Sequence, residues 1–97
     1  MSRRRYLVAY DIADPKRWRQ VYDVVRCYGD RMQYSVYLCD LDEVERIKLL
    51  SALRTVINHR LDRVAIVDLG DPSGKRAAAI EFMGSALPLP DLGPQII

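Results

Sequence analysis

A short apolar run that ends in a carboxylate opens the chain and constrains its fold more than any other feature. Residues 6–10 read YLVAY, Asp11 follows at once, and residues 14–17 read DPKR. So short an apolar run, ended by a charge, is typical of a buried strand. The pattern predicts a strand that delivers Asp11 to a sheet edge. Because side chains alternate along a strand, we expect Tyr10 and Asp11 to point to opposite faces, with Tyr10 packed in the core rather than stacked on a base.

A helix is predicted directly after this strand. Asp14 is a suitable N-cap, Pro15 fits the first helical position, and Gly29 supplies a stop. The apolar side chains recur at helical spacing and are expected to face the core. They are Trp18, Val21, Tyr22, Val25 and Tyr28.

The middle of the chain predicts more strand and a second helix. Residues 31–41 are rich in β-formers and fit either one long bent strand or two short strands with a kink near Ser35. Asp42 and Glu45 have the spacing of a capping box at the start of the second helix. The apolar face predicted for that helix consists of Val44, Ile47, Leu50, Leu53 and Ile57.

Two further strands complete the predicted order β-α-β(β)-α-β-β. Residues 63–69 indicate a buried strand, and residues 77–83 give a weaker strand pattern. Two helices on one face of a mostly antiparallel sheet form a ferredoxin-like α+β sandwich, here with an extra C-terminal strand. We assign residues 1–83 to this domain and residues 84–97 to an extended, proline-rich tail.

Charge is distributed unevenly, although the net charge is only +2. Residues 1–31 hold eight lysines or arginines against four aspartates, and the arginines crowd the sequence around Asp11. Such a bias fits binding to a phosphate backbone or a merely solvated face. The two cysteines, Cys27 and Cys39, fit no disulfide or metal-binding spacing and are expected to be buried thiols in a reduced compartment. With no membrane span or signal peptide in the pattern, we expect a cytoplasmic protein.

Asp11 is the candidate catalytic and metal-binding residue. A carboxylate among arginines, with no nearby His or Cys, points to a metal ion and a phosphate, whereas the alternative is a side chain that caps the following loop. Since Asp14 is expected to be used as the helix cap, one carboxylate is too few for Mg²⁺. A second Asp11 from a two-fold-related subunit would supply the missing ligand, which predicts one Mg²⁺ ion shared across a homodimer.

Three arginines are candidates for nucleic-acid binding, because guanidinium groups pair bidentately with phosphate. They are Arg17, Arg19 and Arg31, and each fits an ordinary surface role equally well. The only histidine, His59, lies at a polar helix exit and is expected to be solvated or to serve the helix end. A His-dependent nuclease mechanism is therefore disfavoured. A glycine-rich phosphate loop and the aromatic pattern of RNA-recognition domains are both missing from the sequence.

The segments 6–12, 14–17, 28–29 and 31–37 together carry a family resemblance. The combination of YDI, DPKR, YG and R-x-QYSV closely resembles the second CRISPR-associated (Cas) protein, the small partner of the Cas integrase in spacer acquisition. The match runs from Tyr6 to Leu41 and is specific as a combination. Beyond residue 69 the resemblance is one of topology only.

The resemblance implies a homodimer in which the two Asp11 side chains face each other and bind Mg²⁺. It implies metal-dependent endonuclease activity on RNA or double-stranded DNA, and assembly with the Cas integrase and DNA, where the dimer acts as a bridge and cleavage is dispensable. It further implies that residues 77–83 cross to the partner's sheet. The alternative function is a toxin-type small endoribonuclease of the same fold. The positions that the family pattern marks here are Arg17, Arg19, Arg31, Ser35 and Tyr37, whereas Trp18 stands where the family often has Leu or Arg.

Overall fold

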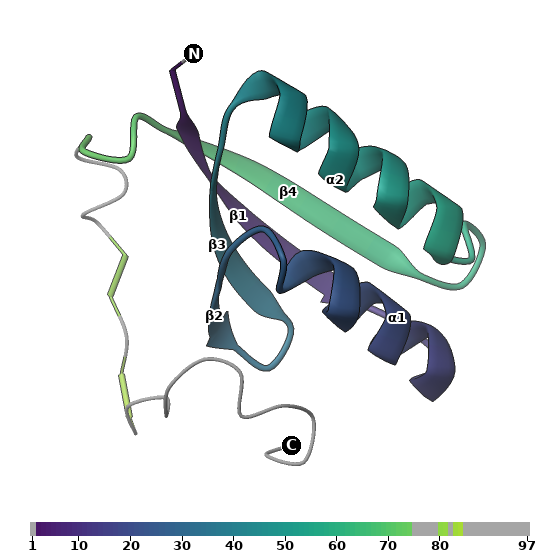
Figure 1. Cartoon of the computed structure of the whole chain (residues 1–97). Helices are drawn as coiled ribbons and strands as arrows, with labels where there is room; N and C mark the ends of the chain where they lie inside the picture. The colour runs from purple at the N-terminus through teal and green to yellow at the C-terminus, as the bar shows by residue number, and fades with distance from the viewer. Residues whose placement is uncertain (1, 75–79, 82, 85–97) are drawn as a thin grey trace.

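The computed structural model describes residues 2–74, 80–81 and 83–84, and within them the chain forms a four-stranded sheet and two helices (Figure 1). Neighbouring strands are antiparallel, and their spatial order is β2-β3-β1-β4. Both helices cover the same face of the sheet (Figure 1). This arrangement is the predicted ferredoxin-like α+β sandwich. The elements are β1 (Arg4–Asp11), α1 (Pro15–Val25), β2 (Asp30–Gln33), β3 (Val36–Leu41), α2 (Glu43–Val56) and β4 (Arg63–Gly70).

Both helices begin as the sequence predicts. The Asp14 carboxylate accepts a hydrogen bond from the backbone N–H of Arg17 at 2.9 Å, and Pro15 occupies the first turn. At α2, Asp42 and Glu45 form a reciprocal capping box, with each side chain accepting from the other residue's backbone N–H. An N-cap of this kind contributes about 1 kcal/mol.

Helix α1 ends earlier than predicted, so Tyr28 lies in the connection to β2 rather than on the helix. The reason is Gly29, whose backbone runs against β3. A Cβ atom at this position would collide with the carbonyl oxygen of Leu38 and would lie 2.5 Å from the sulfur of Cys39. Only glycine permits this approach, and the chain must leave the helix before Gly29 to make it.

Residues 31–41 form two strands, not one long bent strand. A turn at Tyr34 and Ser35 separates β2 from β3, in agreement with the predicted kink near Ser35. The carbonyl oxygen of Ser35 accepts a hydrogen bond from the backbone N–H of Tyr10 at 3.0 Å. This bond fixes the turn against the end of β1.

The core lies between the helices and one face of the sheet. On α2 the predicted apolar face is partly wrong, because Val44 and Ile47 are 48% and 55% exposed, while Leu49 and Leu53 are buried. Apolar residues occur around much of this helix, so its periodicity did not fix which side faces the sheet. The buried residues are Tyr6, Val8, Tyr10, Trp18, Val21, Tyr22, Val25, Tyr37, Cys39, Leu41, Leu49 and Leu53.

The face of the sheet that the helices do not cover is called the open face below. The alternate residues of the strands point to it. Strand β4 was predicted to be buried, but within the described residues no strand pairs with its outer edge. Its Val64 and Ile66 pack on the core, while Ala65 and Val67 are exposed on the other side. The open face consists of Leu7, Ala9, Asp11, Val36, Leu38, Arg63, Ala65 and Val67, together with the Arg5–Asp40 pair.

The two cysteines have different surroundings. Cys39 is buried as predicted, and burial raises the pKa of its thiol to about 12. Cys27 is exposed, which contradicts the prediction, because α1 ends before it. Neither helix in the described part of the chain has the length and apolar character that crossing a bilayer requires. Of the predicted strand at 77–83 and the tail at 84–97, residues 77–79, 82 and 85–97 lie outside the described residues.

Candidate functional site

Asp11 is the last residue of β1 and is exposed on the open face. Its predecessor Tyr10 points into the core and is 5% exposed, so the predicted division between the two faces is confirmed. Strand β1 lies between β3 and β4 and is bonded to both. The backbone that carries the Asp11 carboxylate is therefore held on both sides at the end of a central strand.

The three predicted supporting residues come together behind Asp11, on the helix-covered side of the sheet. The ring of Tyr10 stacks against that of Tyr37, with centroids 6.3 Å apart, and the Tyr10 backbone bonds to Ser35. Burial raises the pKa of the Tyr10 phenol. These residues contact the strand that carries Asp11, and they do not share its face.

Arg17 is held by a buried carboxylate. Its Nε and Nη2 atoms donate to the two oxygens of Asp62 at 2.8 and 3.2 Å, and the Asp62 side chain has no exposed surface. Asp62 also accepts from the backbone N–H groups of Ala13 and Asn58. The Arg17 guanidinium, with these two backbone bonds, holds the pKa of Asp62 well below its usual range. The cluster ties the loop after Asp11 to the loop before β4, and nucleic-acid binding by Arg17 stays a prediction.

Arg19 and Arg31 lie against a column of stacked rings, which we call the aromatic column: Tyr22, Trp18 and Tyr34. Trp18 stacks on Tyr22 with centroids 5.4 Å apart and on Tyr34 with centroids 5.1 Å apart. The Arg19 guanidinium lies 5.7 Å from the Tyr22 ring, and that of Arg31 lies 5.9 Å from the Tyr34 ring. The column thus places one predicted phosphate-binding arginine at each end.

Arg31 does not lie on the same face as Asp11. It pairs in register with Tyr37, whose side chain is buried under the helices. Arg19 belongs to α1, where it makes an exposed i,i+4 contact with Asp23 at 3.3 Å. Exposed pairs of this kind are weak, so Arg19 can exchange its partner at little cost. Nucleic-acid binding by Arg19 and Arg31 is untested and stays a prediction.

The basic N-terminal cluster is not near Asp11, although the sequence suggested it. Arg5 precedes Asp11 by six residues on the same strand, a separation of about 20 Å. Arg3, Arg4 and Arg5 are each paired there, with Glu45, Asp68 and Asp40 respectively. Sequence proximity was misleading because an extended strand moves its two ends far apart.

The cation that does lie beside Asp11 was missed by the sequence analysis. Arg63, the first residue of β4, is the register partner of Asp11, and both side chains are exposed on the open face. Opposed residues on antiparallel strands have Cβ atoms about 5 Å apart. The signal that could have found Arg63 is its place at the start of the strand predicted at 63–69, but only the strand register reveals the pairing.

The side chains around Asp11 form only part of a Mg²⁺ site. Among the described residues no group of three or more His, Cys, Asp or Glu side chains could hold a metal. Asp11 offers one carboxylate, and Mg²⁺ is held in proteins by one or two carboxylates together with waters and phosphate oxygens. One protomer therefore supplies one ligand, and the set fits Mg²⁺ when a second Asp11 joins it. His59 is not a candidate, because its Nε2 lies 2.9 Å from the Arg54 carbonyl oxygen at the end of α2, as predicted.

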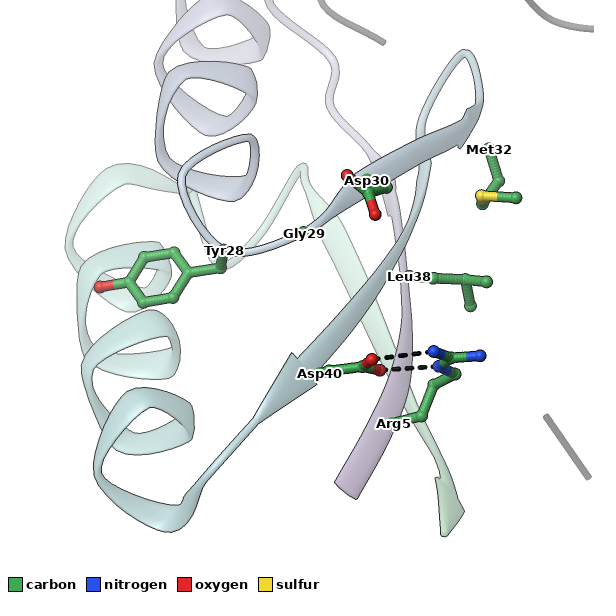
Figure 2. A pocket seen from close by; sticks show the side chains of 7 residues that line it. All are labelled: Arg5, Tyr28, Gly29, Asp30, Met32, Leu38 and Asp40. Atoms are coloured by element: carbon green, nitrogen blue, oxygen red, sulfur yellow. Dashed lines mark hydrogen bonds and ion pairs between the residues drawn. The ribbon is translucent and has the colours of Figure 1, made fainter. Parts of the chain in front are cut away.

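A pocket of about 380 Å³ lies toward the other end of β1 (Figure 2). Figure 2 shows Arg5 and Asp40 side by side in its lining, joined by hydrogen bonds of 2.7 and 2.8 Å. The Arg5 guanidinium holds the pKa of Asp40 below its usual value. Because this pair is self-neutralising and lies far from Asp11, the pocket is not part of the candidate site. Its lining is Arg5, Tyr28, Gly29, Asp30, Met32, Leu38 and Asp40.

Comparison with known proteins identifies the family. A family model described as CRISPR associated protein Cas2 matches residues 4–77, which include both β1 and β4. The chain belongs to the Cas2 family. A Cas2 relative from Rhodospirillum rubrum, named CRISPR-associated endoribonuclease Cas2 1, is 47% identical over 81 residues, covering 84% of this chain and 78% of the relative. Another from Thermus thermophilus, named CRISPR-associated endonuclease Cas2 2, is 38% identical over 95 residues, covering 95% and 93% of the two chains.

Solved structures agree with the Cas2 assignment. Streptococcus pyogenes Cas2, crystallised at pH 6.5, superposes with a TM-score of 0.73 at 28% identity, covering 82% of this chain and 99% of that one. The Thermus thermophilus protein TT1823, described as hypothetical, gives a TM-score of 0.76 at 32% identity, covering 93% and 100%. The predicted family and fold are therefore confirmed.

Proposed function

We propose that this Cas2 protein is a metal-dependent endonuclease in which Asp11 is the catalytic metal ligand. The observation that carries the proposal is the position of Asp11, exposed at the end of a central strand in a chain of this family. Relatives bear the names endoribonuclease and endonuclease, which supports phosphodiester cleavage in RNA or double-stranded DNA.

The active form in this proposal is a homodimer joined through the open face. That face is largely apolar, with Leu7, Ala9, Leu38, Ala65 and Val67, and Val67 is 47% exposed in the protomer. An antiparallel sheet with one uncovered apolar face gains stability by packing that face against another surface. A two-fold axis near Asp11 would bring the two carboxylates together, since a residue on such an axis meets its own copy.

The two Asp11 carboxylates would hold one Mg²⁺ ion, which offsets their mutual repulsion. When bound, the ion would supply charge stabilisation for the phosphodiester oxygens and lower the pKa of an attacking water. The chain's own contribution is to fix the position of the carboxylates. Strand β1 does so through its bonds to β3 and β4, and the Asp62 cluster does so by holding the following loop at Ala13.

Cleavage assays on Asp11→Ala test the nuclease proposal. Wild type should cleave labelled RNA or duplex DNA only with Mg²⁺, and Asp11→Ala should lose at least about a hundredfold in rate, as expected when a metal ligand is removed. Glu43→Gln is the matched control, because it removes an exposed carboxylate on α2 that is remote from Asp11 in the fold, and it should cleave like wild type. Equal rates for wild type and Asp11→Ala would show that a contaminating nuclease is responsible.

We also propose a role in CRISPR adaptation, with the dimer bridging the Cas integrase and duplex DNA. Membership of the Cas2 family favours this role over the alternative of a toxin-type endoribonuclease. Asp11→Ala should then still support integrase assembly and spacer acquisition, because bridging depends on surfaces rather than on the metal. Failure of wild-type protein to bind a purified Cas integrase would contradict the adaptor role and leave the nuclease proposal standing.

A further inference from the structure

Arg63 is the one cation that the structure places beside Asp11 on the open face, among the described residues. The three predicted phosphate-binding arginines do not share this face. Arg17 is bound by Asp62, while Arg19 and Arg31 flank the aromatic column. Of these four arginines, only Arg63 lies on the face of the sheet that carries Asp11.

We propose that Arg63 binds the phosphate group of the nucleic acid that Asp11 acts on. The inference rests on the proposed nuclease function and adds a substrate-holding residue to it. Its basis is the antiparallel register of β1 and β4, which sets Asp11 opposite Arg63 at the end of the sheet.

The reach of the side chains supports this assignment. Opposed Cβ atoms lie about 5 Å apart, and an arginine side chain is long enough to place its guanidinium next to an anion held at the neighbouring carboxylate. No ion pair joins Arg63 to Asp11 or to another residue in the described part of the chain. Both groups are therefore available to a ligand in the protomer.

Charge balance explains why a cation is needed there. A carboxylate alone repels a phosphate, and two facing Asp11 carboxylates repel it more strongly. One Arg63 from each protomer brings the pair of sites to electrical neutrality before a metal enters. A guanidinium also donates two parallel hydrogen bonds to phosphate oxygens, which orients the phosphodiester as well as attracting it.

Binding measurements at several salt concentrations test the assignment without requiring cleavage. The probes are a fluorescein-labelled single-stranded RNA and a labelled DNA duplex, titrated with the full chain and followed by fluorescence anisotropy. Arg63→Gln should bind roughly tenfold more weakly, because each protomer then neutralises one phosphate fewer. For each phosphate no longer neutralised, the slope of log affinity against log salt should become shallower by about 0.9 for the duplex or 0.7 for the RNA. Whichever probe shows the change in slope identifies the polymer held at this site.

Two control variants separate phosphate binding from a general charge effect. Arg54→Gln removes an exposed arginine from the last turn of α2 and should leave affinity and slope at wild-type values. Arg63→Lys keeps the charge but cannot make the bidentate pair, so it should fall between wild type and Arg63→Gln. Because Arg54 and Arg63 are both exposed, all three variants should unfold close to the wild-type temperature.

A double-mutant cycle in metal-free buffer locates the contact at Asp11. Asp11→Asn removes a repulsive charge and should tighten binding, and this gain should be smaller when Arg63 is already Gln. The assignment would be overturned if Arg63→Gln kept the wild-type affinity and salt slope. It would also be overturned if the changes in binding free energy of Asp11→Asn and Arg63→Gln simply added in the double mutant. If wild type does not cleave but Arg63→Gln still weakens binding, the nuclease proposal fails and the phosphate site stands.

Discussion

The Asp62 carboxylate accepts four hydrogen bonds from three groups. It accepts from two nitrogens of Arg17 and from the backbone N–H groups of Ala13 and Asn58, and its side chain is fully enclosed. Removing that charge would leave the Arg17 guanidinium without its counter-ion and the two backbone donors with a weaker acceptor. The loop that follows Asp11 is therefore held firmly only while the Asp62 carboxylate is ionised.

This cluster predicts a pH dependence of stability. The pKa of Asp62 is lowered in the folded protein relative to about 3.9 in the unfolded chain, so its stabilisation is present above the unfolded value and lost as pH falls below about 4. Urea unfolding of wild type should give a free energy of unfolding that declines from pH 6 towards pH 3, whereas Asp62→Asn should be less stable at pH 6 and lose less on acidification. Asp23→Asn, which changes an exposed carboxylate, should keep the wild-type decline, and the same decline in Asp62→Asn would contradict the prediction.

For single residues, the sequence predicted which face of the sheet a side chain points to, but not which side chains lie next to it in space. That Tyr10 and Asp11 face opposite sides follows from strand alternation, which is a local property. That Arg63 lies beside Asp11 depends on the register of β1 with β4, and the register is set by turns and packing far from either residue. Arg3, Arg4 and Arg5 are close to Asp11 in the sequence but far from it in space, because the extended strand β1 separates them.

At the scale of elements, the aromatic column joins the β2–β3 turn to α1. Trp18 of α1 stacks on Tyr34 of the turn, and its ring N–H lies 3.4 Å from the Ser35 hydroxyl oxygen. Tyr34 is 46% exposed, whereas Trp18 is 8% exposed. Trp18 is thus the link through which the turn, and Arg31 near it, is held on the helix.

Trp18→Leu is therefore expected to destabilise the fold. The loss of two ring stacks and of buried area should cost about 2 kcal/mol in the free energy of unfolding. Tyr34→Leu, which keeps the Trp18–Tyr22 pair, should cost about 1 kcal/mol or less. Urea unfolding followed by far-ultraviolet circular dichroism measures both values. A Trp18→Leu protein as stable as wild type would mean that the column contributes nothing to folding.

The predictions for helices were correct where a few adjacent residues determine the structure, and wrong where tertiary packing determines it. The helix starts at Asp14 and Asp42 were correct because capping is a property of a few adjacent residues. The end of α1 was placed too late, since the approach of Gly29 to β3 is a tertiary contact that periodicity does not record. The exposed position of Val44 was missed for the same reason.

At the scale of the whole molecule, the open face and the outer face of α2 give a paired test of the proposed homodimer. Val67 on β4 and Val44 on α2 are 47% and 48% exposed, so neither substitution buries a charge within the protomer alone. Only Val67 lies on the face that carries Asp11. Replacing each with aspartate introduces the same charge and the same change of side chain in two different places.

Val67→Asp should weaken dimerisation by about two orders of magnitude, because a two-fold seam would bury the new carboxylate from both protomers without a partner. Val44→Asp should remain dimeric, since its carboxylate lies in the first turn of α2, where the helix dipole favours it. Sedimentation equilibrium measures both constants, and circular dichroism confirms that each variant folds. Metal-dependent cleavage should fall with the dimer in Val67→Asp, because a lone Asp11 supplies one ligand where the proposed site needs two. A dimeric Val67→Asp protein would place the interface elsewhere and separate the two Asp11 side chains.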